Sequence, residues 1–199
     1  MSFLCEAFPP DAGLRTDAPS ACAAVSNDEA VLLEIQRRDV ALALWLRPEP
    51  PGWWRLTNAL LAAAPFRAAC EDAPEAAVDG VLAALGQPVP VQLAADMTQL
   101  ALVFAAVTRK ERVRIRLDGV THDSCRRFHM DATGLRLLCT YRGAGTQWTL
   151  CGPDCRVPHQ APACSVALIK GTRHEPPPPE GCLHRSPPVS LLPENRRAR

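Results

Sequence analysis

The strict alternation in Arg112-Val-Arg-Ile-Arg-Leu117 is the sequence feature that most constrains the fold. Successive side chains of a β-strand leave opposite faces, so Val113, Ile115 and Leu117 share one face and the arginines share the other. A pattern of this kind predicts a strand whose apolar face packs inward. Residues 112–117 are therefore expected to be a half-buried strand.

The residue patterns before this strand and after it predict different secondary structure. Before it, the capping box Ser26-Asn-Asp-Glu29 predicts a helix to about Arg38, and a short strand should follow it. Further helices are expected at 56–70, 73–85 and 91–107. After it, strands are expected at 128–131, 135–141, 147–150 and 164–170, with a glycine turn before 147. Helices first and strands second predict an α+β fold. The expected division is a loose lead-in (1–24), a helical half (25–110), a β-rich half (111–190) and a tail (191–199).

Composition restricts the classes of partner. A chain of 199 residues is long enough for one domain with a full core, and its net charge of +1 gives no electrostatic argument for binding nucleic acid or an anionic membrane. The first residues lack a signal pattern, and no stretch approaches the roughly 20 apolar residues of a spanning helix. The nine cysteines are therefore expected to be reduced thiols in the cytoplasm.

The segment Cys125-Arg-Arg-Phe-His-Met-Asp131 suggests a metal site. His129 and Asp131 are two apart, so on a strand both side chains leave the same face. A later histidine would complete two imidazoles and one carboxylate, the set that holds a non-haem ferrous ion and leaves positions open. His184 is the candidate for that ligand, although a lone H-x-D pair also arises by chance.

Two other arrangements of cysteine and histidine compete with this one. Three thiols and an imidazole close in sequence could form a structural zinc site, or could simply be residues of a variable loop. They are Cys151, Cys155, His159 and Cys164. We expect them not to form a closed site. A catalytic pair of Cys125 with His129 is disfavoured, because on an extended chain the two lie too far apart for direct contact.

Three stretches together closely resemble a bacterial family catalogued as domain of unknown function 1826. They are Cys125–Asp131, Leu135–Trp148 and His184–Pro188; Asp39–Pro48 and the helix around Asp96 fit the same family. The resemblance covers most of 25–190. It implies soluble bacterial proteins whose genes often lie near zinc-homeostasis functions, and it implies no established activity.

The chain departs from the family pattern at two places. Pro176–Pro179 stands where the family usually has a glycine-rich segment, and Asn195-Arg-Arg-Ala-Arg199 stands where it continues into an apolar strand. A final strand is therefore expected to be missing or replaced, with metal binding retained and turnover weak or absent.

The order H-x-D, then H, is also similar to that of the Fe(II)/2-oxoglutarate oxygenases, which form a double-stranded β-helix. The resemblance implies Fe(II) as cofactor, with zinc as the alternative metal, and a basic residue that anchors the 2-oxoglutarate carboxylate. Arg196 or Arg197 lies at roughly the right distance along the chain for that role. Arg185, beside His184, should point away from the metal.

These observations predict N-terminal helices packed on a small double-stranded β-helix, a cupin-like barrel with a metal at its mouth. The leading function is an oxygenase of the Fe(II)/2-oxoglutarate type that acts on a small molecule. The alternative is a non-catalytic zinc-binding accessory protein that works with a metal-homeostasis partner. A degenerate barrel that only binds a partner is a third possibility.

Overall fold

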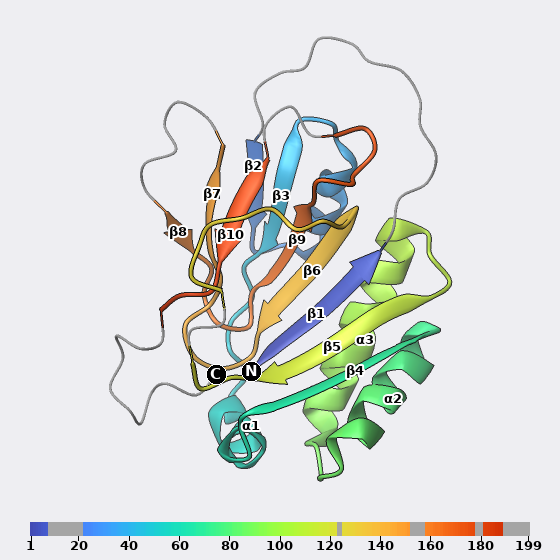
Figure 1. Cartoon of the computed structure of the whole chain (residues 1–199), viewed down its shortest axis with the longest axis vertical. Helices are drawn as coiled ribbons and strands as arrows, with labels where there is room; N and C mark the ends of the chain where they lie inside the picture. Colours follow the sequence, from blue (N-terminus) through green and yellow to red (C-terminus); the bar gives the residue numbers. More distant parts are fainter. Residues whose placement is uncertain (8–21, 123–124, 152–157, 178–180, 189–199) are drawn as a thin grey trace.

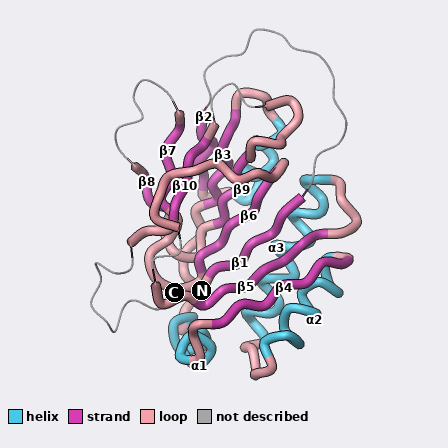
Figure 2. Tube along the Cα trace, viewed as in Figure 1, coloured by secondary structure: helices cyan, strands magenta, loops and turns pink. Residues whose placement is uncertain are grey.

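The computed structural model describes residues 1–7, 22–122, 125–151, 158–177 and 181–188. These residues form three layers: helices, a seven-stranded sheet and a three-stranded sheet (Figures 1 and 2). The fold is thus of mixed helix and strand, as the sequence predicts.

The large sheet has the order β2-β3-β9-β6-β1-β5-β4. Its strands are β1 (Ser2–Ala7), β2 (Cys22–Ser26), β3 (Val40–Trp45), β4 (Phe66–Asp72), β5 (Val113–Gly119), β6 (Leu135–Thr140) and β9 (Val166–Lys170). Only β2 and β3 run parallel, and every other pairing is antiparallel. The β5 strand carries the alternation that the sequence shows, with Val113, Ile115 and Leu117 buried.

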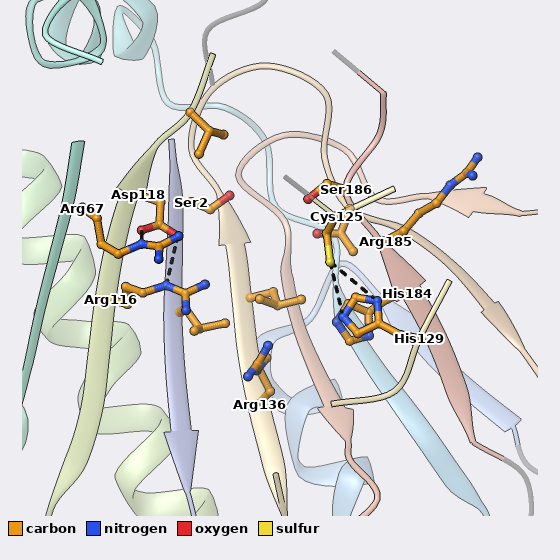
Figure 3. Close-up of a pocket in the computed structure, with 14 residues that line it drawn as sticks. Ser2, Arg67, Arg116, Asp118, Cys125, His129, Arg136, His184, Arg185 and Ser186 are labelled. Atoms are coloured by element: carbon orange, nitrogen blue, oxygen red, sulfur yellow. Dashed lines mark hydrogen bonds and ion pairs between the residues drawn. The ribbon is translucent and has the colours of Figure 1, made fainter. Parts of the chain in front are cut away.

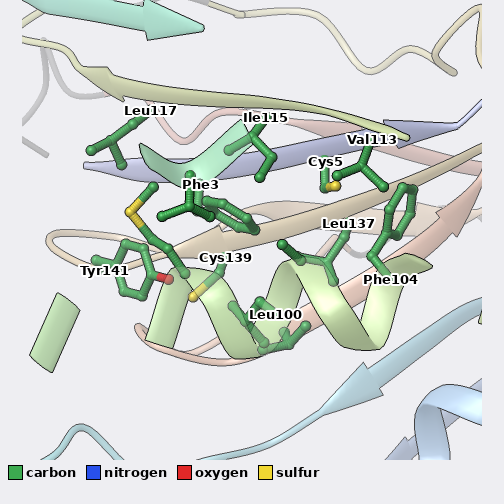
Figure 4. Packing of buried hydrophobic residues seen from close by; sticks show 14 of the residues in the cluster. Phe3, Cys5, Leu100, Phe104, Val113, Ile115, Leu117, Leu137, Cys139 and Tyr141 are labelled. Carbon is green, nitrogen blue, oxygen red and sulfur yellow. The ribbon is translucent and has the colours of Figure 1, made fainter. Parts of the chain in front are cut away.

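The helices cover one face of this sheet. They are η1 (Glu29–Gln36, a 3-10 helix), α1 (Trp53–Ala62), α2 (Pro74–Leu85) and α3 (Val91–Thr108). The side chains of Leu100 and Phe104 lie against Phe3, Ile115 and Leu137 of the sheet (Figure 4). We call this surface the helix-covered face, and most of its side chains are apolar.

The small sheet lies over part of the opposite face. Its strands, in the order β10-β7-β8, are β10 (Cys182–Arg185), β7 (Gln147–Leu150) and β8 (His159–Gln160). Trp148 and Cys182 pack in a second core with Leu42, Ala167 and Ile169 of β3 and β9. On this side the strands β1, β5 and β4 are left to line a cavity, and we call their surface the open face.

An ion pair joins two of the segments that carry the family resemblance. Arg47, just after β3, contacts the Asp96 carboxylate on α3 through both terminal nitrogens, at 2.6 and 2.8 Å. Both side chains are largely buried, with 14% and 18% of their surface exposed. A paired guanidinium and carboxylate satisfy each other in such a site, so we assign this pair a structural role in fixing α3 against β3.

Several predicted elements differ from those observed. Ser2–Ala7, placed in the lead-in, form a strand between β5 and β6. The helix predicted at 56–70 ends at Ala62, and Phe66–Asp72 form β4. Both strands depend on pairing with β5, which is remote in sequence from β1 and β4. The helix predicted after the capping box is η1, and Asp28, not Ser26, caps it.

The predicted barrel is not confirmed. The described residues form an open sheet and a smaller one, without closure. Within the predicted strand 128–131, only His129 makes a β-bridge. The division at 24, 110 and 190 remains a prediction.

One helix of the described residues, α3, has the length and composition to cross a membrane. Five of its residues are nevertheless buried against the rest of the protein: Leu93, Met97, Leu100, Ala101 and Phe104. A core helix passes the same test of hydropathy, so the finding is weak evidence for a span.

Candidate metal centre

Backbone pairing places His129 beside His184. The two residues form an isolated antiparallel bridge, in which each N–H donates to the other's carbonyl, at 3.1 and 3.0 Å. Residues directly opposite in an antiparallel pair project to the same side. Their imidazole rings therefore lie together, with centroids 4.7 Å apart.

The neighbouring chain fixes Asp131 from behind. Its carbonyl accepts a hydrogen bond from Thr172 N at 2.8 Å. Gly171 passes so close that a Cβ there would lie 2.6 Å from the Asp131 carbonyl oxygen and 2.2 Å from that of Thr133. Only glycine permits this approach without displacement, so Gly171 helps to define where the carboxylate lies.

The three side chains meet at one point. One ligand atom from each of His129, Asp131 and His184 lies within 4.8 Å of the other two. His184 Nε2 is 3.0 Å from Asp131 Oδ2, and His129 Nε2 is 3.5 Å from Oδ1. The predicted convergence of these three residues is confirmed. Their spacing suits ligands that share an ion at about 2.0–2.2 Å from each.

Hydrogen bonding favours one nitrogen of His129 as the ligand. Its Nδ1 lies 3.0 Å from the Arg127 carbonyl oxygen, which can only accept, so Nδ1 carries the proton. The Nε2 lone pair is then free on the side of Asp131. A backbone carbonyl that accepts from the other ring nitrogen commonly orients a metal-binding histidine in this way. His184 is 5% exposed, and its Nδ1 has no hydrogen-bond partner among the described residues.

The charge of Asp131 is stabilised by its neighbours. Burial favours the neutral acid, but the hydrogen bond and charge of His184, with Arg136 and His129, outweigh it and lower the pKa of Asp131. Arg136 Nη1 lies 2.7 Å from Asp131 Oδ1. The carboxylate is therefore ionised at neutral pH, the form that a metal requires.

A cavity of about 190 Å³ adjoins the two histidines (Figure 3). It is lined by Ser2, Leu4, Arg67, Arg116, Asp118, Val120, Cys125, His129, Arg136, Leu138, Thr146, His184, Arg185 and Ser186. The ligand set thus has protein on one side and a cavity on the other. That arrangement leaves room for a bound small molecule.

The prediction that Cys125 cannot reach His129 is wrong. Its Sγ lies 3.7 Å from Nδ1 and 3.6 Å from Nε2 (Figure 3). The chain between them is not extended, because the Cys125 carbonyl accepts a hydrogen bond from Ser186 N while His129 pairs with His184. A thiol therefore stands at the mouth of the candidate centre.

Of the remaining sequence candidates that the structure describes, His159 and Arg185 do not belong to the candidate ligand set. Cys155, Arg196 and Arg197 lie outside the described residues, so two expectations stay predictions: that the four cysteine and histidine residues form no closed zinc site, and that Arg196 or Arg197 anchors a carboxylate. His159 stacks on Trp148, with centroids 4.5 Å apart. Arg185 directs its guanidinium over the Phe128 ring and to Gln147, away from the metal side as expected.

The arginines and the aspartate of the open face were not selected from the sequence. Arg116 belongs to the alternation of β5, which indicated that it faces away from the core. Nothing local indicated that this surface would lie beside His129 and His184, since the juxtaposition depends on sheet order.

Comparison with known proteins gives a family and no activity. No curated protein matches the chain, and no solved structure matches it. A family model described as "Protein of unknown function (DUF1826)" matches residues 26–198 and so covers the candidate ligands. The chain therefore belongs to the DUF1826 family.

Proposed function

We propose that this protein binds a divalent metal through His129, Asp131 and His184 and uses it in small-molecule chemistry. The observation that carries the proposal is the gathering of two imidazoles and one ionised carboxylate within 4.8 Å, beside a cavity. Structural metal sites close four protein ligands around the ion, whereas catalytic sites keep a position open. Three ligands and an adjoining cavity favour the second kind.

The donor set supports Fe(II) as the metal. Two histidines and a carboxylate on one face are typical of non-haem iron oxygenases. When bound, the ion would polarise reactants held in its open positions. The protein's own part is to hold the ligands: the bridge between His129 and His184 sets the imidazoles, and Gly171 and Thr172 set Asp131. An Fe(II)/2-oxoglutarate-type reaction on a small molecule is the leading form of this proposal.

Zinc is the alternative metal, and one observation favours it. The Cys125 thiol lies 3.6 Å from His129 Nε2. Ligand atoms about 2.0–2.3 Å from a tetrahedral ion are separated by roughly this distance. With Cys125 as a fourth ligand the site would be closed. The protein would then be a non-catalytic zinc-binding accessory in metal homeostasis. In either form we place it in the cytoplasm, without a membrane or nucleic-acid partner.

The test is metal binding by purified protein, followed by turnover. Wild type and His184→Ala should be stripped with chelator and titrated anaerobically with Fe(II) and with Zn(II). Changing a residue that only supports a metal ligand typically weakens metal binding about 10- to 100-fold, so loss of a ligand itself should weaken it about 100-fold or more. Replacing the exposed His122 by Ala is the matched control and should change nothing. Equal affinity of wild type and His184→Ala would contradict the proposal.

Two further variants separate the alternatives. If iron is the metal, Cys125→Ala should leave affinity unchanged, and 2-oxoglutarate should yield succinate only when His129 is intact. If four protein ligands, including Cys125, bind zinc, Cys125→Ala should weaken Zn(II) binding and no succinate should form. Asp131→Asn should weaken the binding of either metal, because the substitution removes the only carboxylate of the ligand set.

A further inference from the structure

The cavity wall opposite the histidines is built by one face of three paired strands. Arg67 pairs with Asp118, which pairs with Ser2; in the next row, Arg116 pairs with Leu4. Because residues two apart share a face, these side chains all leave the open face, while Phe3 and Leu117 enter the core. The register of the sheet thus gathers polar side chains beside the candidate centre.

Positive charge exceeds negative charge in this wall. The lining residues of the cavity include the arginines Arg67, Arg116, Arg136 and Arg185 but a single carboxylate, that of Asp118. Asp131 contacts Arg136 from behind the cavity. Arg67 and Arg116 therefore share one counter-charge, which leaves one positive charge over. A metal ion bound by the Asp131 carboxylate would add further positive charge beside the cavity.

Asp118 holds both arginines in place. Its Oδ1 is 2.9 Å from Arg67 Nε, and its Oδ2 is 2.9 Å from Arg116 Nε. The Asp118 side chain is 12% exposed and that of Arg116 34%, whereas the Arg67 side chain is 65% exposed. In the described part of the chain, no residue accepts a hydrogen bond from the terminal nitrogens of Arg67 or Arg116. The Arg116 guanidinium is thus the better oriented of the two, and both arginines keep terminal nitrogens as donors for a ligand.

Figure 3 shows Arg136 between this group and the histidines. Its side chain is 16% exposed, so its charge is little screened by water. The arginines and the two histidines therefore line one continuous cavity. The cavity is smaller than the roughly 300–1,000 Å³ of sites for drug-sized ligands, which suits a small molecule.

We propose that this cavity binds a small oxyanion, held by Arg116 and Arg67 through their terminal nitrogens and facing the histidines. Carboxylate and phosphate both match the guanidinium fork, which donates two parallel hydrogen bonds to either. The ligand is thus a small carboxylate or phosphate anion. The inference deepens the proposed function by naming its co-substrate class, and rests on that function only for the end of the ligand that meets the metal.

Anion binding is tested first on metal-free protein in the presence of chelator, by calorimetric titration. Succinate and inorganic phosphate are the probes, and their separate affinities show which oxyanion the site prefers. Arg116→Gln should weaken binding of the preferred anion about 10- to 100-fold, the range for charge-assisted hydrogen bonds. Arg114→Gln is the matched control, since Arg114 lies exposed on the same strand two residues away. The affinity of Arg114→Gln for the same anion should stay at the wild-type value.

Arg116→Lys guards against loss of folding. It keeps the charge without the fork, so an affinity between those of wild type and Arg116→Gln supports bidentate binding. Binding of neither anion to folded wild type, or equal weakening by Arg114→Gln, would overturn the inference. Anion binding is measured without metal and metal binding in a separate titration, so the two proposals can fail separately. Anion binding in this assay, with no metal binding in the Fe(II) and Zn(II) titrations, would refute only the proposed function. Metal binding in those titrations, with no anion binding in this assay, would refute only this inference.

Discussion

The two faces of the large sheet are built from alternate residues of the same strands, yet they differ in chemistry. On β5, Ile115 and Leu117 are buried under the helices, while Arg116 and Asp118 line a cavity. The helix-covered face gains stability from burial of apolar surface. The open face holds charges that cost stability unless they are paired, and such groups mark sites of function. Neighbouring residues of one strand therefore serve stability on one face and the cavity on the other.

The largest effect should follow from opening a space on the helix-covered face. Phe104 on α3 is fully buried against the sheet. Phe104→Ala should lower the free energy of unfolding by about 3–5 kcal/mol, the usual cost of removing a buried aromatic side chain. Denaturant unfolding measures it. Leu102→Ala on the same helix is the control, because Leu102 is 42% exposed and should change stability little. The comparison fails if both variants lose the same amount.

A smaller effect concerns the one lysine on the helix-covered face. Lys170 is 1% exposed and donates to the Arg37 carbonyl, and burial lowers its pKa to about 8 from 10.5. Between these two values the unfolded chain binds more protons than the native protein, so the stability of the native protein rises with pH. Relative to Lys170→Met, wild type should gain about 2 kcal/mol from pH 8 to pH 10.

Unfolding curves at several pH values measure that difference. Subtracting the variant removes the contributions of thiols that titrate in the same range. Parallel stability profiles for wild type and Lys170→Met would show that Lys170 is not titrating below its ordinary pKa.

The smallest effect comes from adding one methyl group at a glycine, either beside the candidate centre or on a helix of the helix-covered face. Gly171→Ala should push Asp131 away from the histidines, because its Cβ would meet the carbonyl oxygens of Thr133 and Asp131. Metal affinity should fall about tenfold, or about 1.4 kcal/mol, as when a residue that supports a metal ligand is changed. Gly80→Ala on α2 is the counterpart, since its Cβ would meet the Cys70 side chain. That variant should lower stability and leave affinity unchanged, so a drop in affinity for both would blur the distinction.

Local pattern was sufficient for much of the fold. The alternation of 112–117 predicted β5 and its inward residues, and the helices expected at 73–85 and 91–107 are α2 and α3. These signals work because the face that a side chain takes depends only on backbone period. Two of the strands that sequence reasoning missed, β1 and β4, exist through pairing with β5. Such pairing is invisible in a local window, since tertiary context decides it.

The sequence by itself determined the ligand types of the candidate centre. A histidine and an aspartate two residues apart, together with one remote histidine, sufficed to name His129, Asp131 and His184. Only the tertiary structure decided what surrounds them. The bend that brings Cys125 to His129, and the register that places Arg67 and Arg116 on one wall beside Asp118, join segments far apart in the chain. The physical reason is that residue type and period set which face a side chain takes, whereas strand order and register set which faces meet.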